Sequence, residues 1–196
     1  AVLLAVPFEY RVGGNARGYY VSGGATGPAL DGLIDLHQLP RTRIPIAGPT
    51  RIATTVLERN TTKEFRFTPQ GPSITEPEWR EALDLVAQAG CEVMVLSGSL
   101  PPGVPDDFYA RVIRLLRPRG IEIVLDSSGP ALAHGIDAGS LLLVKPSLGE
   151  LQQYAGRQLD GTAEIGRVAM DIVEARKARY VAVTMGHHGA VRAREA

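Results

Sequence analysis

The fold is decided by residues 121–151, which read IEIVLDSSGPALAHGIDAGSLLLVKPSLGEL. Short apolar strands are predicted over residues 121–125 and 141–144, a short helix over 131–135, and another short helix that contains Glu150. Neighbouring parallel strands need a crossover of this kind, and strands that are buried on both faces are continuously apolar. The stretch therefore predicts a parallel sheet with helices packed against it.

The same alternation continues on both sides of this stretch. Thr75 and Glu78 have the spacing of a capping box, which predicts the start of a helix that ends near Gly90. A predicted strand over residues 17–22 runs into the glycine-rich turn GGATG, residues 23–27. Further predicted elements are strands over 92–96 and 180–184 and helices over 30–36, 105–119 and 162–177. We expect an α/β protein with a doubly wound, mostly parallel sheet and helices on both faces.

One region has a different pattern. Residues 51–58 (RIATTVLE) and 64–68 (EFRFT) flank the polar segment 59–63. Their alternation predicts an antiparallel hairpin with one covered face and one wet face. A hairpin of this kind does not fit into a parallel sheet, so we expect a separate small β lobe. Residues 1–12 also alternate as a strand does.

Composition and charge exclude several classes of protein. The chain has 196 residues, of which 44% are hydrophobic, and its 21 basic residues balance 21 acidic ones. A nucleic-acid-binding protein normally has a basic excess, and a disordered chain has few apolar residues. The single cysteine, Cys91, is typical of a reducing compartment, and no apolar stretch reaches the ~18 residues of a membrane span. We therefore expect a cytoplasmic protein that binds neither nucleic acid nor membranes.

Polar and glycine-rich groups follow four of the predicted strands. In open parallel sheets, ligands bind outside the carboxyl ends of the strands, so these four strand ends predict a lined cleft. The groups are Ser97-Gly98-Ser99, Asp126-Ser127-Ser128-Gly129, Lys145-Pro146-Ser147 through Glu150, and Thr184-Met185-Gly186 through Gly189. A nucleotide or another anion would be held there by local donors, since the chain has no net charge.

Each group also has a purely structural interpretation. Asp126 could bind a metal or form an Asx turn, and Lys145 could contact a phosphate. Glu150 could orient Mg²⁺ through water, or it could be a favourable acid at a helix N-terminus. Gly186 and Gly189 could let backbone amides approach an anion, or they could form a simple hairpin turn. The residues alone leave these alternatives open. The adjacent His187 and His188 are not expected to bind a metal, and GGATG lacks the Lys-Ser/Thr of a phosphate loop.

Seven stretches together resemble the PfkB branch of the ribokinase-like sugar kinases, and the bacterial phosphofructokinases in particular. They occur in the order in which that family has them and span nearly the whole chain. They are GGATG (23–27), TRIATTVLE (50–58), EFRFTPQGP (64–72), VLSGSLPPGV (95–104), IVLDSSG (123–129), LVKPSLGEL (143–151) and VAVTMGHHGAV (181–191).

The resemblance implies an enzyme that transfers the γ-phosphoryl group of ATP, with Mg²⁺, to a phosphorylated ketose. Fructose 6-phosphate is the expected acceptor; fructose 1-phosphate and tagatose 6-phosphate are the alternatives. A non-catalytic module that binds nucleotide or sugar is an alternative of a different class. The resemblance also implies a β lid over residues 1–12 and 42–70 that pairs two subunits as a homodimer, and an α/β core over 13–41 and 71–196.

The resemblance further assigns residues to roles. Substrate binding falls to Arg51, Ser99, Gly13 and Gly14. ATP binding falls to Lys145, Thr184, Gly186 and Gly189. The metal falls to Glu150 and Asp126.

The chain also departs from the family pattern. The Gly-Ala-Gly-Asp motif, which carries the family's catalytic aspartate, is absent, so no catalytic residue is assigned. The early Gly-Gly-x-x-x-Asn segment is absent too, and Ser147 stands where the family has Asn. We expect that the catalytic motif lies beyond Ala196 and that an N-terminal helix is missing. The 196 residues alone are expected to have no kinase turnover, because the base and the anion hole would be gone.

Overall fold

The structure is a computed structural model that describes residues 16–61 and 63–195. Its largest sheet is mixed and has five strands. Its strand order is β5-β6-β7-β8-β9. The strands are β5 (Val93–Ser97), β6 (Glu122–Asp126), β7 (Leu141–Val144), β8 (Ala178–Thr184) and β9 (Ala190–Arg194). The first four run parallel, and β9 pairs antiparallel with β8. The predicted α/β class and the predicted parallel strands are confirmed.

Helices connect the parallel strands and cover one face of this sheet. They are α3 (Phe108–Leu116) with the 3-10 turn η2 (Arg117–Arg119), α4 (Gly129–Ala138), α5 (Leu148–Ala155) and α6 (Gly161–Glu174). Right-handed crossovers that all step in the same direction put these helices on the same face. The fully buried side chains of Leu96, Leu125 and Val181 alternate with half-buried neighbours, as expected for strands covered mainly on one side. On the other face, Val93 keeps 43% of its surface exposed.

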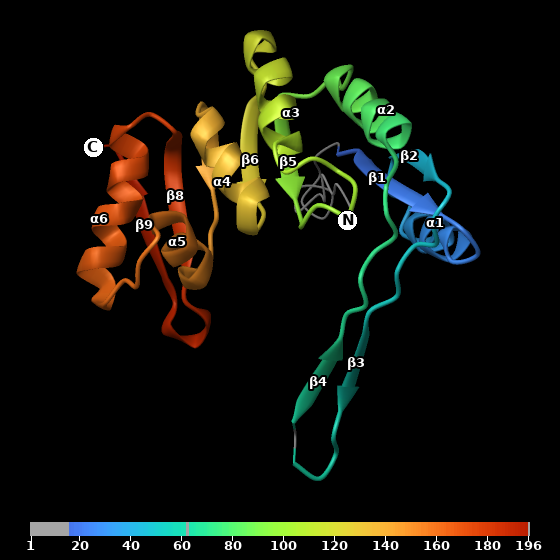
Figure 1. Cartoon of the computed structure of the whole chain (residues 1–196), viewed down its shortest axis with the longest axis horizontal. Coiled ribbons are helices and arrows are strands. Elements are labelled where there is room, and N and C mark those ends of the chain that lie inside the picture. Colours follow the sequence, from blue (N-terminus) through green and yellow to red (C-terminus); the bar gives the residue numbers. More distant parts are fainter. Residues whose placement is uncertain (1–15, 62, 196) are drawn as a thin grey trace.

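A second unit precedes this sheet in the chain. It consists of β1 (Gly18–Gly23), α1 (Gly27–Leu36) and β2 (Arg41–Ile46), and the two strands pair in parallel. Figure 1 shows this unit below α2 (Glu76–Ala87) and to the right of β5. The resemblance put residues 42–70 in the lid, and pairing of residues 41–46 with β1 was not predicted. A proline inside a strand removes a donor from the sheet. Pro45 is tolerated here because, among the described residues, β2 pairs with β1 only.

The predicted hairpin is confirmed as β3 (Thr54–Leu57) and β4 (Glu64–Phe67), which pair antiparallel. In Figure 1 it projects away from both sheets and from the helices. Every residue of both strands is exposed, so none of the described residues covers either face of the hairpin. The expected covered face is therefore not present in the described chain, although the strand pairing is correct.

Other differences lie at the ends of elements. The sequence predicted no strand after residue 184, whereas β9 extends the sheet beyond the short turn η3 (Gly186–His188).

The predicted helix start at Thr75 is confirmed, and the carboxylate of Glu78 accepts from the backbone N–H of Thr75 at 2.7 Å. No helix among the residues that the structure describes is both long and apolar enough to span a bilayer.

Candidate functional site

The ends of β5 and β6 are joined by backbone and side-chain hydrogen bonds. Ser97 and Asp126 are register partners, and the N–H of Gly98 donates to the carbonyl of Asp126 at 2.9 Å. The hydroxyl of Ser127 donates to the carbonyl of Gly98 at 3.1 Å. These bonds fix the start of the loop that carries Ser99, which is exposed.

The ends of β7 and β8 continue the same line. The N–H of Lys145 donates to the carbonyl of Leu125 at 3.0 Å, and the N–H of Thr184 donates to the carbonyl of Pro146 at 2.9 Å. Ser147 forms an isolated parallel bridge with Thr184. The four strand ends therefore share one rim, as the sequence predicted.

Asp126 and Lys145 face each other across this rim. The Nζ of Lys145 lies 3.1 Å from Oδ1 of Asp126, and the two side chains are 42% and 39% exposed. An exposed ion pair of this kind contributes at most about 1 kcal/mol to stability. Both groups can therefore exchange their partner for a ligand at little cost to the fold.

Glu150 lies at the start of α5, and its carboxylate has a structural partner. One of its oxygens accepts from the N–H of Ser147 at 2.7 Å, and the hydroxyl of Ser147 accepts from the N–H of Glu150 at 3.3 Å. This is a complete capping box. The serine that replaces the family's Asn thus caps the helix, and the role of Glu150 at a metal stays a prediction.

The turn after β8 is tight and glycine-dependent. Gly186 and Gly189 have φ angles of 58° and 86°, and the N–H of Met185 donates to the carbonyl of Gly189 at 2.9 Å. Both glycines are exposed at the rim. The rings of His187 and His188 lie against each other at an interplanar angle of 42°, with centroids 3.9 Å apart. Within residues 16–61 and 63–195, no three potential metal-ligating side chains cluster.

Arg51 and Ser99 are brought together although 48 positions separate them in the sequence. Both line one groove of about 440 Å³ at the base of the hairpin. Its other lining residues are Gln70, Gly71, Leu100, Pro101, Pro102, Gly103, Val104 and Asp106. Of these, Gln70 and Asp106 supply polar groups that sequence reasoning missed; Gln70 lies within EFRFTPQGP, the only signal that pointed to it.

Tyr109 binds the backbone of the loop that carries Ser99. Its buried hydroxyl donates to the carbonyl of Gly98 at 2.8 Å. Burial, with a smaller effect of the Asp126 carboxylate, raises the pKa of Tyr109 well above its usual value. The hydroxyl therefore stays protonated and keeps the Ser99 loop in place over the whole physiological pH range.

Two further observations concern a second groove and two of the predicted substrate-binding residues. A larger groove of about 620 Å³ lies between α6 and β9 and contains none of the predicted site residues. Gly13 and Gly14, predicted to bind substrate, lie outside the described residues, as does the strand predicted over residues 1–12.

Comparisons with known proteins identify the family of the chain. The sequence pattern of the pfkB family carbohydrate kinases matches residues 11–195. A Mycobacterium tuberculosis protein named ATP-dependent 6-phosphofructokinase isozyme 2 is 38% identical over 182 residues, which are 92% of this chain and 53% of that protein. The protein of the same name from Escherichia coli is 32% identical over 181 residues, which are 92% of this chain and 59% of that protein. The chain thus spans little more than half the length of these relatives.

The crystal structure of Escherichia coli phosphofructokinase-2 in complex with fructose-6-phosphate matches with a TM-score of 0.89 at 31% identity. The match covers 95% of this chain and 62% of that one, and it confirms the ribokinase-like α/β fold. Because the family pattern and these relatives extend over nearly its whole length, this chain belongs to the pfkB family of carbohydrate kinases.

Proposed function

We propose that the protein is an ATP-dependent kinase that phosphorylates a sugar phosphate, with fructose 6-phosphate as the acceptor. The observation that carries the proposal is the groove that Arg51 and Ser99 share at one end of the strand-end rim. A sugar phosphate has one strongly anionic group and several hydroxyls, and this groove offers a guanidinium and small hydrogen-bonding groups. The names of the relatives support the same reaction.

Arg51 has the geometry to hold the phosphate of the sugar. Its Nη1 donates to the carbonyl of Pro69 across 3.5 Å, the outer limit of a hydrogen bond. A guanidinium has five N–H donors in a planar fork, so donors remain for a bidentate contact with a phosphate. Ser99, which lines the same groove, can donate to or accept from a sugar hydroxyl.

The other end of the rim suits a nucleotide. Lys145 supplies a positive charge that is only half-buried, and the glycines at 186 and 189 leave backbone open to close approach. Thr184 adds a hydroxyl at the end of β8. The triphosphate would then extend from this turn towards Asp126 and Ser99, with its γ-phosphorus next to the sugar groove.

The residues present fit Mg²⁺ only if it takes most of its ligands from phosphates and water. Asp126 is half-exposed at the rim, whereas one oxygen of Glu150 is already used in the capping box. Mg²⁺ is commonly bound by one or two carboxylates together with substrate phosphates. When bound, it would neutralise charge on the phosphate oxygens, and Asp126 is the residue placed to hold it.

In the proposed reaction, an acceptor hydroxyl oxygen forms a bond to the γ-phosphorus while the bond from that phosphorus to the β-γ bridging oxygen breaks. ADP leaves with the electron pair of the broken bond, and the hydroxyl loses its proton to a base. Such transfers depend almost entirely on positioning and charge stabilisation. The described residues supply the positioning on both sides, and the base is assigned to the family's aspartate, which the 196 residues do not contain.

A coupled assay of ADP release by the full-length protein tests the proposal. We expect ATP-dependent turnover with fructose 6-phosphate that exceeds turnover with fructose 1-phosphate or tagatose 6-phosphate. Preference for another acceptor would replace the substrate and keep the reaction. Binding of ATP and sugar phosphate without turnover would instead favour a non-catalytic module.

We also propose that the hairpin pairs two copies of the protein. Val56 and Phe65 are cross-strand partners, as are Thr54 and Phe67, so the three apolar side chains lie on one face. Phe65 is 47% exposed and Phe67 is 61% exposed. A projecting apolar face of this kind is typical of a subunit interface. Sedimentation of the full-length protein should show a dimer, and Phe65→Asp should shift it to monomer; a monomeric wild type would contradict the proposal.

A further inference from the structure

We propose that the GGATG turn, residues 23–27, and Thr50 form a clamp that positions Arg51, so that Thr50 is a positioning residue for the sugar phosphate. The inference rests on the proposed role of Arg51 and extends it to residues that do not touch the groove. A glycine-rich turn between a strand and a helix usually suggests a phosphate loop. Here the turn is filled by the chain's own backbone.

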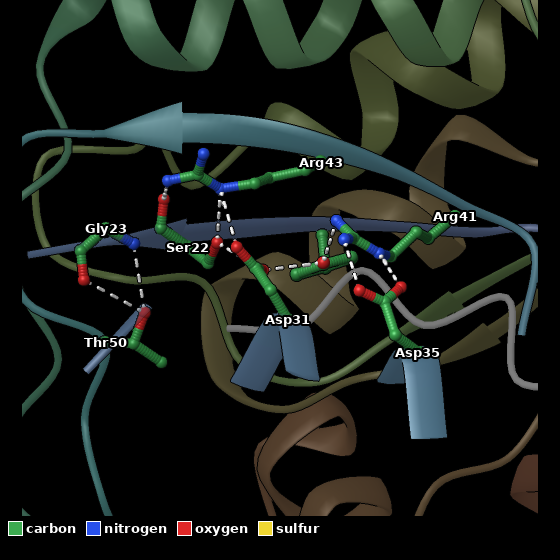
Figure 2. Close-up of polar contacts among 8 residues, drawn as sticks. Ser22, Gly23, Asp31, Asp35, Arg41, Arg43 and Thr50 are labelled. Atoms are coloured by element: carbon green, nitrogen blue, oxygen red, sulfur yellow. Dashed lines mark hydrogen bonds and ion pairs between the residues drawn. The ribbon is translucent and has the colours of Figure 1, made fainter. Parts of the chain in front are cut away.

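Four hydrogen bonds join the turn to Thr50, one of them a long contact of 3.4 Å in which the hydroxyl of Thr50 donates to the carbonyl of Gly23. The N–H of Thr50 donates to the carbonyl of Gly23 at 3.0 Å, and the N–H of Gly23 donates to the hydroxyl of Thr50 at 3.0 Å. The hydroxyl of Thr26 donates to the carbonyl of Thr50 at 2.5 Å. Figure 2 shows the contact between Gly23 and Thr50. Thr50 is thus held through its N–H, its carbonyl and its hydroxyl, and Arg51 is the next residue.

The glycines of the turn allow this close approach. A Cβ on Gly23 would lie 1.8 Å from the carbonyl oxygen of Ile46. Gly24 has a φ of 59°, and a Cβ there would lie 2.5 Å from the Cα of Pro49. Any side chain at either position would displace the segment that leads to Thr50. These two glycines therefore let the backbone of the turn lie directly against the backbone of the segment that leads to Thr50.

A network of side-chain hydrogen bonds holds the end of β1, directly before the turn. Ser22 is fully buried, and its hydroxyl donates to the carboxylate of Asp31 at 2.9 Å. The hydroxyl of Tyr20 donates to the same carboxylate oxygen at 2.7 Å, and Nε of Arg43 donates to the hydroxyl of Ser22 at 2.7 Å. Figure 2 shows how these contacts join α1 to both strands of the β1–β2 sheet. The end of β1 is therefore fixed immediately before Gly23.

A residue of α2 binds the backbone at Ala47, three positions before Thr50. A carboxylate oxygen of Glu78 accepts from the N–H of Ala47 at 2.7 Å. Only Gly48 and Pro49 lie between Ala47 and the clamped Thr50, so the segment has little freedom. The guanidinium of Arg51 can then reach the groove from only a narrow range of positions. Pre-ordering of this kind lowers the entropy lost when the substrate binds.

The experiment compares Thr50→Val, which removes the hydroxyl, with Thr50→Ser, which keeps it, in the full-length protein. Because the loss of one or two hydrogen bonds is at stake, Thr50→Val should raise the KM for fructose 6-phosphate about fivefold to tenfold and change the KM for ATP by less than about twofold. Thr50→Ser should restore the wild-type KM. Thr162→Val, the same change at an exposed position on α6, is the matched control and should change neither constant.

A double variant separates positioning from general damage. If Thr50 acts through Arg51, Thr50→Val should add nothing to the KM of Arg51→Ala, because the group that it positions is already gone. Multiplication of the two effects would overturn the inference, as would a wild-type KM for Thr50→Val. Arg51→Ala alone tests the proposed function: if it leaves the KM for the sugar phosphate unchanged, the substrate role of Arg51 fails and the inference falls with it.

Hydrogen exchange gives a readout that does not depend on activity. In Thr50→Val the amide of Gly23 loses the hydroxyl that accepts its hydrogen bond, so its exchange should become faster, while Thr50→Ser should retain protection. Unchanged exchange at Gly23 in Thr50→Val would contradict the clamp.

Discussion

The rim of the five-stranded sheet and the segment that carries Arg51 lie at the two sides of the same candidate site, but they are held differently. At the rim, Asp126, Lys145 and Thr184 follow buried strands, and backbone hydrogen bonds between neighbouring strands fix their positions. Arg51 lies outside any strand, and side-chain contacts of Thr50 and Glu78 hold the segment before it. The residues on the proposed nucleotide side are therefore held by the hydrogen bonds of the sheet. The proposed sugar side depends on a few side-chain contacts, which single substitutions can remove.

The comparison predicts a large difference in stability between core and hairpin. Leu125 is fully buried in β6, and Gly135 of α4 packs so closely that a Cβ there would lie 2.5 Å from Cδ2 of Leu125. Leu125→Ala should lower the free energy of unfolding by ~2–5 kcal/mol through the cavity that it leaves. Urea denaturation measures this loss.

Phe65→Ala in the hairpin is the matched change outside the core. Since Phe65 is exposed within the chain, the subunit itself should lose no more than ~0.5 kcal/mol. Equal losses, measured at protein concentrations at which all proteins compared are monomeric, would mean that the hairpin is part of the folding core, and the contrast between the two regions would disappear.

Arg51→Ala should have the next largest effect, on the sugar side alone. Loss of a charge-assisted contact with phosphate, worth ~1.5–3 kcal/mol, should raise the KM for fructose 6-phosphate about tenfold to a hundredfold. Arg51→Lys keeps the charge but loses the planar fork, so it should recover only part of the loss. Steady-state kinetics with saturating ATP measures both. A rise in the KM for ATP of the same size would show that the two sides are not separate.

Lys145→Ala should give the opposite pattern. Removal of the ammonium group should raise the KM for ATP about tenfold, and the KM for the sugar phosphate should stay near its wild-type value. The ion pair with Asp126 is exposed, so the fold should keep its stability within ~1 kcal/mol. If the melting temperature falls sharply instead, Lys145 is structural and the nucleotide assignment is wrong.

The smallest expected effect concerns pH and the segment before Arg51. Hydrogen bonds from the N–H of Thr75, and further from the N–H of Ala47 and the hydroxyl of Thr75, lower the pKa of Glu78 below its ordinary 4.5. A carboxyl group with a lowered pKa in the folded state stabilises the protein above its unfolded pKa and loses this contribution as the pH falls through the folded value.

Glu78→Gln should therefore be less stable than wild type at neutral pH, and the difference should shrink as the pH falls below the folded pKa. Urea midpoints measured from neutral to acid pH test this. A difference that stays constant with pH would mean that the charge of Glu78 plays no part.

The sequence predicted the rim well because its signals are local. An apolar run followed by Asp126, Lys145 or Thr184 places that residue at a strand end, and parallel pairing then brings strand ends together. The Thr75–Glu78 capping box was predicted for the same reason. The functional roles of these residues remain proposals.

The rest could not be predicted because it depends on contacts between distant residues. The hydrogen bond between Gly23 and Thr50 joins residues that are 27 positions apart, and no local sequence pattern predicts it. Neither β2, which contains Pro45, nor β9, which follows the glycine turn at 186–189, was predicted as a strand of these sheets. Glu150 has the spacing of both a metal-orienting residue and a helix cap, and only the structure shows the cap.

A crystal structure of the full-length protein with fructose 6-phosphate and a non-hydrolysable ATP analogue would show whether both ligands bind where we propose. We expect the sugar phosphate group to lie within hydrogen-bond distance of Arg51. The triphosphate should then lie along the rim from Gly186 towards Asp126, with its γ-phosphorus facing the groove. Density for either ligand in the groove between α6 and β9, with the rim left to solvent, would contradict it.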